Sequence, residues 1–163
     1  MRLYIVRLVL TAIVATSASC ALPGDTADFT GKYLAEPSKK APSSGSTLEV
    51  VQKEDAIEIT LLMSEKRTVS RCPLDGSEGD YTSPGGIAGK CKARIKGRNL
   101  VVESVVVVTN SRVRTKERWQ LSQDGKTLAI KSEHDFPDAP PEVSAALSDD
   151  TSMTTKYKRV ENK

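Results

Sequence analysis

The sequence is poor in the side chains on which active sites and metal sites usually depend. Its 163 residues include one histidine, His134, and three cysteines, none of them in a C-x-x-C arrangement. A zinc site needs several cysteine or histidine ligands at short spacing, and a general base needs a partner within hydrogen-bonding reach. The serines have no identifiable histidine or acid partners. The sequence therefore predicts no metal, no cofactor and no catalytic residue, and we expect that the protein is not an enzyme.

Aromatic residues and an excess of charge are also scarce. The seven aromatic residues make up 4% of the chain, too few to favour a platform that stacks on carbohydrate. The 24 basic residues stand against 21 acidic ones, so the bulk charge does not predict nucleic-acid binding. The glycine-rich segment 85–89 lies between two strand signals and precedes no helix, so it does not predict a phosphate-binding loop.

A short apolar run stands at the N-terminus. Arg2 and Arg7 precede or flank the segment 8–15, which is followed by small residues. About eight apolar residues cannot span a hydrocarbon core that needs roughly 20, so residues 1–19 are typical of a secretory signal peptide. The alternative is a buried N-terminal strand or helix. Removal of residues 1–19 would take away two basic residues and no acid, leaving 22 basic against 21 acidic residues.

Two interpretations of the cleavage site remain open. Cleavage by signal peptidase after Ala18 or after Ala21 satisfies the preference for small residues. Cleavage after Ala21 would remove Cys20, whereas cleavage after Ala18 would leave it as a free thiol. The stretch Ser17–Cys20 instead resembles a bacterial lipobox, in which the cysteine is acylated and becomes the new N-terminus, although Ser17 stands where leucine is usual. Ala21 after the cysteine then implies the outer membrane. We favour lipidation of Cys20, with the protein exported to the periplasm or outer membrane, or secreted if the cysteine is lost.

The two later cysteines predict a disulfide. With Cys20 lipidated or removed, Cys72 and Cys91 form an even pair in an oxidising compartment, with 18 residues between them in the chain. A bridge of this length is worth on the order of 3 kcal/mol in the loop-entropy treatment. It would hold the glycine-rich connection 75–89. A redox or metal-binding pair is the alternative.

From residue 47 onward the hydrophobic pattern has a period of two, which is typical of β-strands. The predicted strands, eight or nine in number, are 28–33, 48–52, 57–62, 66–72, 90–96, 100–109, 112–121, 127–136 and 154–160. Tight turns such as Asp124-Gly125 connect them, and segments 73–79 and 83–86 are expected to be turns. The valine-rich segment 100–109 is apolar on both faces, so we expect it to be the most buried strand.

This pattern predicts an all-β protein, an antiparallel up-and-down meander that closes into a barrel to hide its edges. A two-sheet sandwich is the alternative. Residues 20–28 would form a lipidated or flexible tether and residues 29–163 a single barrel domain with a long loop at 137–153.

Three segments carry a resemblance to a known group. The opening Asp28–Tyr33, the hairpin Trp119–Leu128 and the closing Lys156–Val160 resemble small exported bacterial lipocalin-like proteins. Tyr33 stands where that group often has tryptophan. The resemblance implies a barrel or cup with room for a small apolar ligand.

Three side chains are candidate ligand contacts. Trp119, Glu117 and His134 share the parity of apolar neighbours and are expected to face inward. An unpaired inward carboxylate is costly, so we hypothesise that Glu117 and His134 pair at a cavity. The cavity wall is expected to include Val50, Ile57, Ile59, Val102, Trp119 and Ile130.

Two runs of cations occupy the opposite parity. They are Lys90, Lys92, Arg94 and Lys96 in one strand, and Arg112, Arg114, Lys116 and Arg118 in another. Such runs are typical of solvated strand faces, but they also suggest a patch for an anionic lipid or an envelope protein. The sequence thus leaves two functions open: a carrier or sensor of a small apolar ligand, or an interaction module without an internal ligand.

Overall fold

The computed structural model describes residues 26–37, 45–140 and 152–161, and these form one antiparallel sheet that curls into a nearly closed barrel. The predicted signal peptide, Cys20 and most of the predicted loop 137–153 lie outside the described residues. The strands are β1 (Gly31–Ala35), β2 (Thr47–Gln52), β3 (Ala56–Met63), β4 (Lys66–Pro73), β5 (Gly79–Thr82), β6 (Ala88–Lys96), β7 (Asn99–Val108), β8 (Ser111–Leu121), β9 (Thr127–Asp135) and β10 (Ser152–Arg159).

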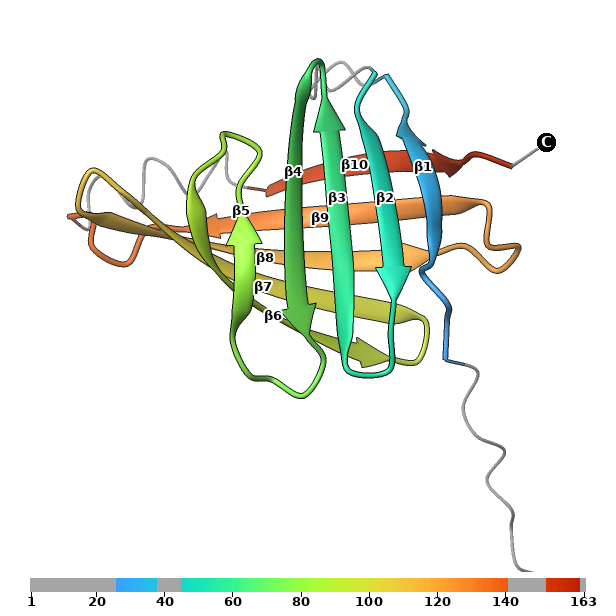
Figure 1. Ribbon diagram of the computed structural model, residues 1–163, viewed down its shortest axis with the longest axis horizontal. Coiled ribbons are helices and arrows are strands. Elements are labelled where there is room, and N and C mark those ends of the chain that lie inside the picture. Colours follow the sequence, from blue (N-terminus) through green and yellow to red (C-terminus); the bar gives the residue numbers. More distant parts are fainter. Residues whose placement is uncertain (1–25, 38–44, 141–151, 162–163) are drawn as a thin grey trace, which may run out of the picture.

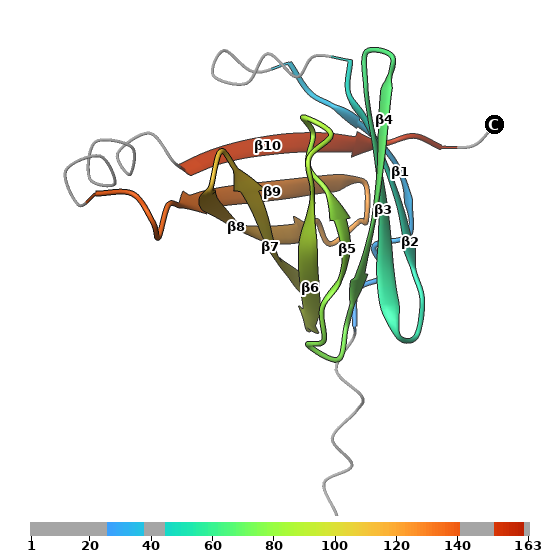
Figure 2. The ribbon, with the colours of Figure 1, turned by 60° about the vertical axis from the view of Figure 1, so that its left-hand side comes forward.

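Every neighbouring pair in the sheet is antiparallel, in the order β4-β3-β2-β1-β10-β9-β8-β7-β6-β5. Pairing of β1 with β10 joins the two ends of the chain. Strands β2 to β4 cross over β6 to β10 at a steep angle (Figure 1), and Figure 2 shows β2 to β4 nearly edge-on with β7 to β9 as the facing wall. The predicted all-β up-and-down barrel is therefore confirmed.

Along each strand, the residues of one parity face the interior of the barrel and those of the other parity face solvent. Leu48 and Val50 of β2 are buried, whereas Glu49 and Val51 between and beside them face outward. The β8–β9 hairpin turns at Asp124-Gly125, where Gly125 has φ 69°, a conformation that glycine adopts without strain. Alternation and turn chemistry together account for most of the meander.

The expectation for the valine-rich segment was wrong on one face. In β7, Leu100, Val102 and Val106 point inward and are buried, but the outward Val107 is 57% exposed. A single-layer antiparallel barrel has only one dry face. Valine favours the extended backbone whether or not it is buried, so a run of valines does not by itself predict burial on both faces.

The N-terminal segment closes one end of the barrel. Phe29 is fully buried, and its carbonyl accepts a hydrogen bond of 2.9 Å from the Tyr33 hydroxyl. The Arg159 guanidinium donates to the Tyr33 oxygen at 2.6 Å and lies over the Tyr33 ring, 5.2 Å from its centroid. Ala27, which the sequence places in the tether, is also buried in the core. This end is a densely packed plug of mainly apolar side chains around the Arg159–Tyr33 contact.

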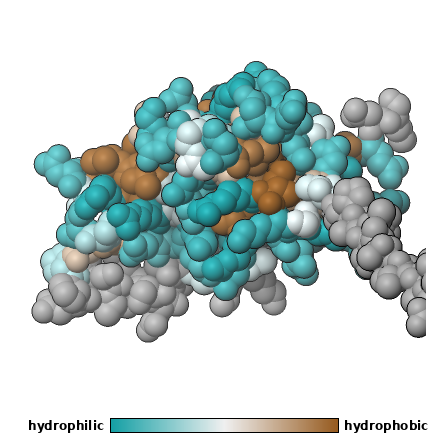
Figure 3. All heavy atoms as spheres, turned by 90° about the horizontal axis from the view of Figure 1, so that it is seen from below, coloured by the Kyte–Doolittle hydropathy of each residue, from teal (hydrophilic) through white to brown (hydrophobic). Residues whose placement is uncertain are grey.

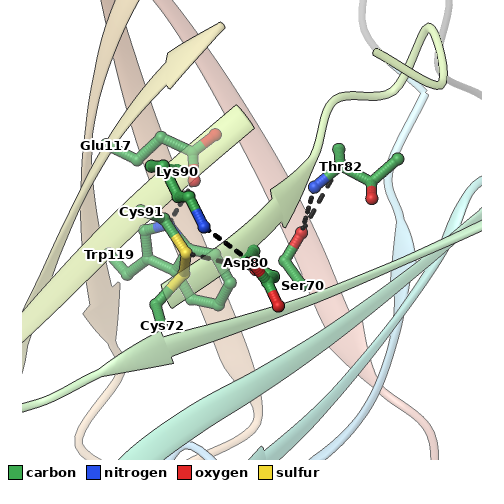
Figure 4. Close-up of a disulfide and its surroundings, with 8 residues drawn as sticks. All are labelled: Ser70, Cys72, Asp80, Thr82, Lys90, Cys91, Glu117 and Trp119. Carbon is green, nitrogen blue, oxygen red and sulfur yellow. Dashed lines mark hydrogen bonds and ion pairs between the residues drawn. A yellow bond between two sulfur atoms is a disulfide. The ribbon is translucent and has the colours of Figure 1, made fainter. Parts of the chain in front are cut away.

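Strands β4 and β5 meet along a seam without a backbone ladder. Three features hold it, as Figure 4 shows in part. The Ser70 hydroxyl accepts a bond of 3.0 Å from the Thr82 amide and donates to its carbonyl at 3.4 Å. The predicted disulfide joins Cys72 of β4 to Cys91 of β6, with 5.2 Å between the Cα atoms. At Gly79 the strands approach so closely that a Cβ would overlap the Arg71 carbonyl oxygen.

Candidate ligand-binding site

A cavity of about 310 Å³ lies inside the barrel, away from the Phe29 plug. Its walls come from strands on both sides of the molecule and are mainly apolar. The lining residues are Ser46, Leu48, Ile59, Leu61, Met63, Thr68, Ser70, Tyr81, Thr82, Pro84, Val102, Glu117, Trp119, Ile130, Ser132, Met153, Thr155 and Tyr157. Met63 and Met153 are 37% and 40% exposed, which marks the mouth of the cavity. A cavity of this size is at the small end of the range for ligand pockets, about 300–1,000 Å³.

Glu117 of β8 is the most unusual side chain in this wall. It faces the barrel interior, is partly buried and lines the cavity. The Trp119 indole donates to one carboxyl oxygen at 2.9 Å, and the Ser132 hydroxyl approaches the other at 3.5 Å (Figure 4 shows the first). Burial raises the pKa of Glu117, and the two hydrogen bonds offset this only in part. The cavity thus contains a carboxyl group that takes up a proton more readily than an exposed glutamic acid does.

Two tyrosines surround the carboxyl group from other strands. Tyr81 comes from β5 and hydrogen bonds Ser104, and Tyr157 comes from β10 and hydrogen bonds Ser46. Burial raises the pKa of both phenols, and the nearby Glu117 charge raises each pKa further. Beside the hydroxyl groups of these tyrosines and of several serines and threonines, Glu117 is the one residue of a charged type in the described cavity wall.

The structure brings two of the three candidate contacts together and separates the third. Glu117 and Trp119 share the cavity, but His134 bonds the Thr115 hydroxyl at 3.0 Å. The β8–β9 register places Thr115 opposite His134 and Glu117 opposite Ser132. The hypothesised Glu117–His134 pair is therefore absent, because the two residues occupy successive inward levels of the hairpin.

The expected cavity wall is correct in most of its members. Ile59, Val102, Trp119 and Ile130 line the cavity. Val50 and Ile57 also face inward, but they pack in the solid core beside it.

Sequence reasoning missed several residues of the wall. Ser132 has the parity of Ile130, and Tyr157 lies in a predicted strand, so alternation could have identified both. Tyr81 lies in β5, which was expected to be part of a turn region; four residues flanked by glycine and polar residues give too little alternation to reveal a strand.

Acidic residues on neighbouring strands form ion pairs with residues of the two cation runs. Glu103 of β7 lies between the two runs. Its carboxylate forms ion pairs with Lys92 at 3.4 Å, Arg94 at 3.7 Å and Lys116 at 3.8 Å. Arg118 pairs with Glu133 at 2.6 Å.

At the ends of the runs, Lys90 pairs with Asp80 at 2.9 Å. The Arg112 guanidinium donates hydrogen bonds to both carboxyl oxygens of Asp138 and lowers the pKa of that carboxyl to about 2. Opposite charges across strands are the favourable arrangement on a solvated face. Figure 3 shows the molecule from below as a mainly hydrophilic surface interrupted by apolar patches. Within the described residues, six of the eight cations thus form ion pairs, but they share only four acids, so the two runs keep an excess of positive charge and the anionic-partner patch stays a prediction.

A wider hollow of about 620 Å³ lies at strands β6 to β9. Its lining combines partners of the outward ion pairs, such as Lys92, Glu103 and Lys116, with residues of the inward parity, such as Thr115 and His134. Charged walls open to water do not favour an apolar ligand. The interior cavity is therefore the better candidate site.

The described residues contain neither a metal-binding cluster nor a membrane-spanning helix. Within residues 26–37, 45–140 and 152–161, no group of three or more His, Cys, Asp or Glu side chains is placed to hold a metal ion. In the same part of the chain, no helix has the length and apolar character needed to cross a bilayer.

The fold and the cavity define a nearly closed, lipocalin-like β-barrel. No protein-family model matches the chain, and no curated protein sequence matches it. Among solved structures, it is similar to a protein described as a REP1-NXSQ fatty acid transporter, with a TM-score of 0.60 and 17% identity over 83% of this chain and 98% of that one. It is also similar to two secretory abundant heat soluble proteins from Ramazzottius varieornatus.

For one of these, the TM-score is 0.57 and the identity 13%, over 84% of this chain and 99% of that one. For the other, protein 4, the values are 0.51 and 15%, over 82% and 95%. At these identities the likeness concerns the fold alone.

Proposed function

We propose that the protein is an exported, lipid-anchored β-barrel that binds a small apolar ligand as a carrier or sensor. The observation that carries this proposal is the interior cavity of about 310 Å³, with mainly apolar walls, a mouth at Met63 and Met153 and a solid plug at the other end. The protein of similar fold that is described as a fatty acid transporter supports the proposal.

The cavity favours the carrier over the interaction module. A barrel that served only as a surface would gain stability from a filled interior, because dense packing adds dispersion contacts and a void forfeits them.

Ligand binding is tested by native mass spectrometry of protein purified from its own host. We expect a co-purifying small molecule, released on denaturation and absent from a variant whose cavity is filled by Ile59→Trp. The matched control is Thr60→Trp, which adds the same ring at the next, outward-facing position of β3. A clean apo mass, together with no binding of the neutral apolar dye Nile red, would contradict the carrier function.

The lipid anchor is tested separately. Metabolic labelling with a radioactive fatty acid is expected to label the protein and to fail for Cys20→Ser, whereas Cys72→Ser/Cys91→Ser keeps the label. Equal labelling of the protein and of Cys20→Ser would rule out an anchor at Cys20.

A further inference from the structure

The cavity contains an acid and no base. Of the side chains that line it in the described part of the chain, Glu117 alone belongs to the charged residue types, and no lysine, arginine or histidine joins it. Arg159, on the inward parity of β10, is held at the plugged end by Tyr33 and the Thr30 carbonyl.

The groups that face Glu117 leave it able to accept another hydrogen bond. From β8 the Trp119 indole donates to one oxygen, and from β9 Ser132 reaches the other only at 3.5 Å. Tyr81 from β5 and Tyr157 from β10 are engaged with serines. No cation approaches from any of these four strands, and His134 is bonded to Thr115 one level away. One carboxyl oxygen is thus weakly satisfied and accessible from the cavity.

This arrangement opposes an anionic ligand. A carboxylate at the end of an apolar chain would have to lie in the same low-dielectric space as Glu117 without a counter-charge. Juxtaposed like charges cost several kcal/mol, and one of the two groups would have to take up a proton. A ligand end that donates a hydrogen bond instead satisfies the free oxygen, and a positive charge adds an ion pair.

We infer that the cavity takes an apolar ligand whose polar end is an amine or, more weakly, an alcohol, and that Glu117 receives this end while a carboxylate is disfavoured. This inference rests on the proposed ligand-binding function and names the ligand class of that cavity. The shared chemistry is a hydrogen-bond donor without negative charge on a chain short enough for about 310 Å³.

The test uses three probes of equal chain length: decylamine, 1-decanol and decanoate at pH 7.5. Trp119 is the only tryptophan of the chain and bonds Glu117, so its fluorescence reports occupancy directly. We expect decylamine to bind at least about tenfold more tightly than decanoate, with decanol between them; tenfold corresponds to about 1.4 kcal/mol. Displacement of Nile red provides an independent reading.

Glu117→Gln keeps the shape of the side chain and its capacity to bond Trp119. In this variant the preference for decylamine over decanoate should fall to within about threefold. The matched control is Glu133→Gln, an acid on the adjacent strand that faces outward to Arg118, and it should keep the full preference. Circular dichroism confirms that each variant is folded.

A measurement on the unmodified protein keeps the inference testable if Glu117→Gln does not fold. Neither decylamine nor decanol titrates between pH 4 and 7.5, whereas Glu117 gains a proton as the pH falls. The preference for the amine over the alcohol should therefore shrink at low pH. A constant preference, or decanoate binding as tightly as decylamine at pH 7.5, would overturn the inference and leave the proposed function standing. Failure of all probes, Nile red included, would instead reject the proposed function and the inference with it.

Discussion

Glu117 is the residue at which the chain departs most clearly from what folding alone would favour. Its position in β8 lies between inward Thr115 and Trp119, where an apolar side chain of similar size would avoid the cost of removing a carboxyl group from water. The Trp119 and Ser132 bonds recover part of that cost. Departures of this kind are expected at functional sites.

The buried position makes stability depend on pH. Burial raises the pKa of Glu117 in the folded protein above its ordinary value, which the unfolded chain retains. The folded state then holds the proton more tightly. The stabilising contribution is complete below the ordinary pKa and is lost as the pH rises through the folded pKa.

We therefore expect the free energy of unfolding of the protein to fall relative to that of Glu117→Gln as the pH is raised from about 4 to 8. Urea unfolding at a series of pH values, followed by circular dichroism, measures both proteins. The control is Glu133→Gln, whose carboxyl group has a lowered pKa through Arg118 and should produce the opposite trend. A difference between the protein and Glu117→Gln that does not vary with pH would contradict the burial of this group.

At the scale of the element, the seam between β4 and β5 is where the barrel is least regular. Hydrogen bonds of the Ser70 hydroxyl and the Cys72–Cys91 disulfide connect the two sides in place of backbone hydrogen bonds. The disulfide joins β4 to β6, the strand that pairs with β5. The close contact at Gly79 depends on the absence of a side chain. The seam therefore depends on a few specific residues, whereas the other strand pairs depend on repeated backbone bonds.

Gly79→Ala tests the seam. An added Cβ would overlap the Arg71 carbonyl oxygen and the Pro73 ring, so β4 and β5 must move apart. We expect a loss of about 1–3 kcal/mol in the free energy of unfolding, the usual range for overpacking. Gly85→Ala is the matched control, because its Cβ would meet nothing nearer than the Ser83 hydroxyl at 3.8 Å. Urea denaturation compares the two; an equal effect would show that the seam tolerates separation.

The same elements show what a sequence can predict. Strands with five or more alternating residues, such as β2, β8 and β9, were predicted because alternation and turn residues are local signals. Strand β5 was missed because its pairing with β6 is the only feature that makes Gly79–Thr82 extended. The choice of Ser132 over His134 as the partner of Glu117 depends on hairpin register, which alternation alone does not specify.

At the scale of the whole molecule, the barrel is asymmetric from end to end. One end is filled by Phe29, Tyr33, Ile57, Leu100 and Leu128, all buried. The other contains the cavity and its methionine mouth. A division of this kind places most of the apolar packing energy in one half and leaves the other half free to hold a ligand.

Phe29→Ala tests whether the plug supports the whole barrel. Removal of a fully buried phenylalanine is expected to cost roughly 3–5 kcal/mol, although Phe29 precedes the first strand. The chain has one other phenylalanine, Phe136, which is partly exposed after β9, so Phe136→Ala is the control and should cost less. Urea unfolding measures both. Similar losses would mean that the segment before β1 adds little to the core.

The plug also determines how a membrane anchor would orient the molecule. Cys20 precedes Thr26 by six residues, which reach at most about 20 Å even when fully extended. An acyl group on Cys20 would therefore hold the barrel by its base, within a short distance of the bilayer, and the opening would look out into the aqueous compartment. Cargo would then meet the mouth of the cavity from the water side or from another protein.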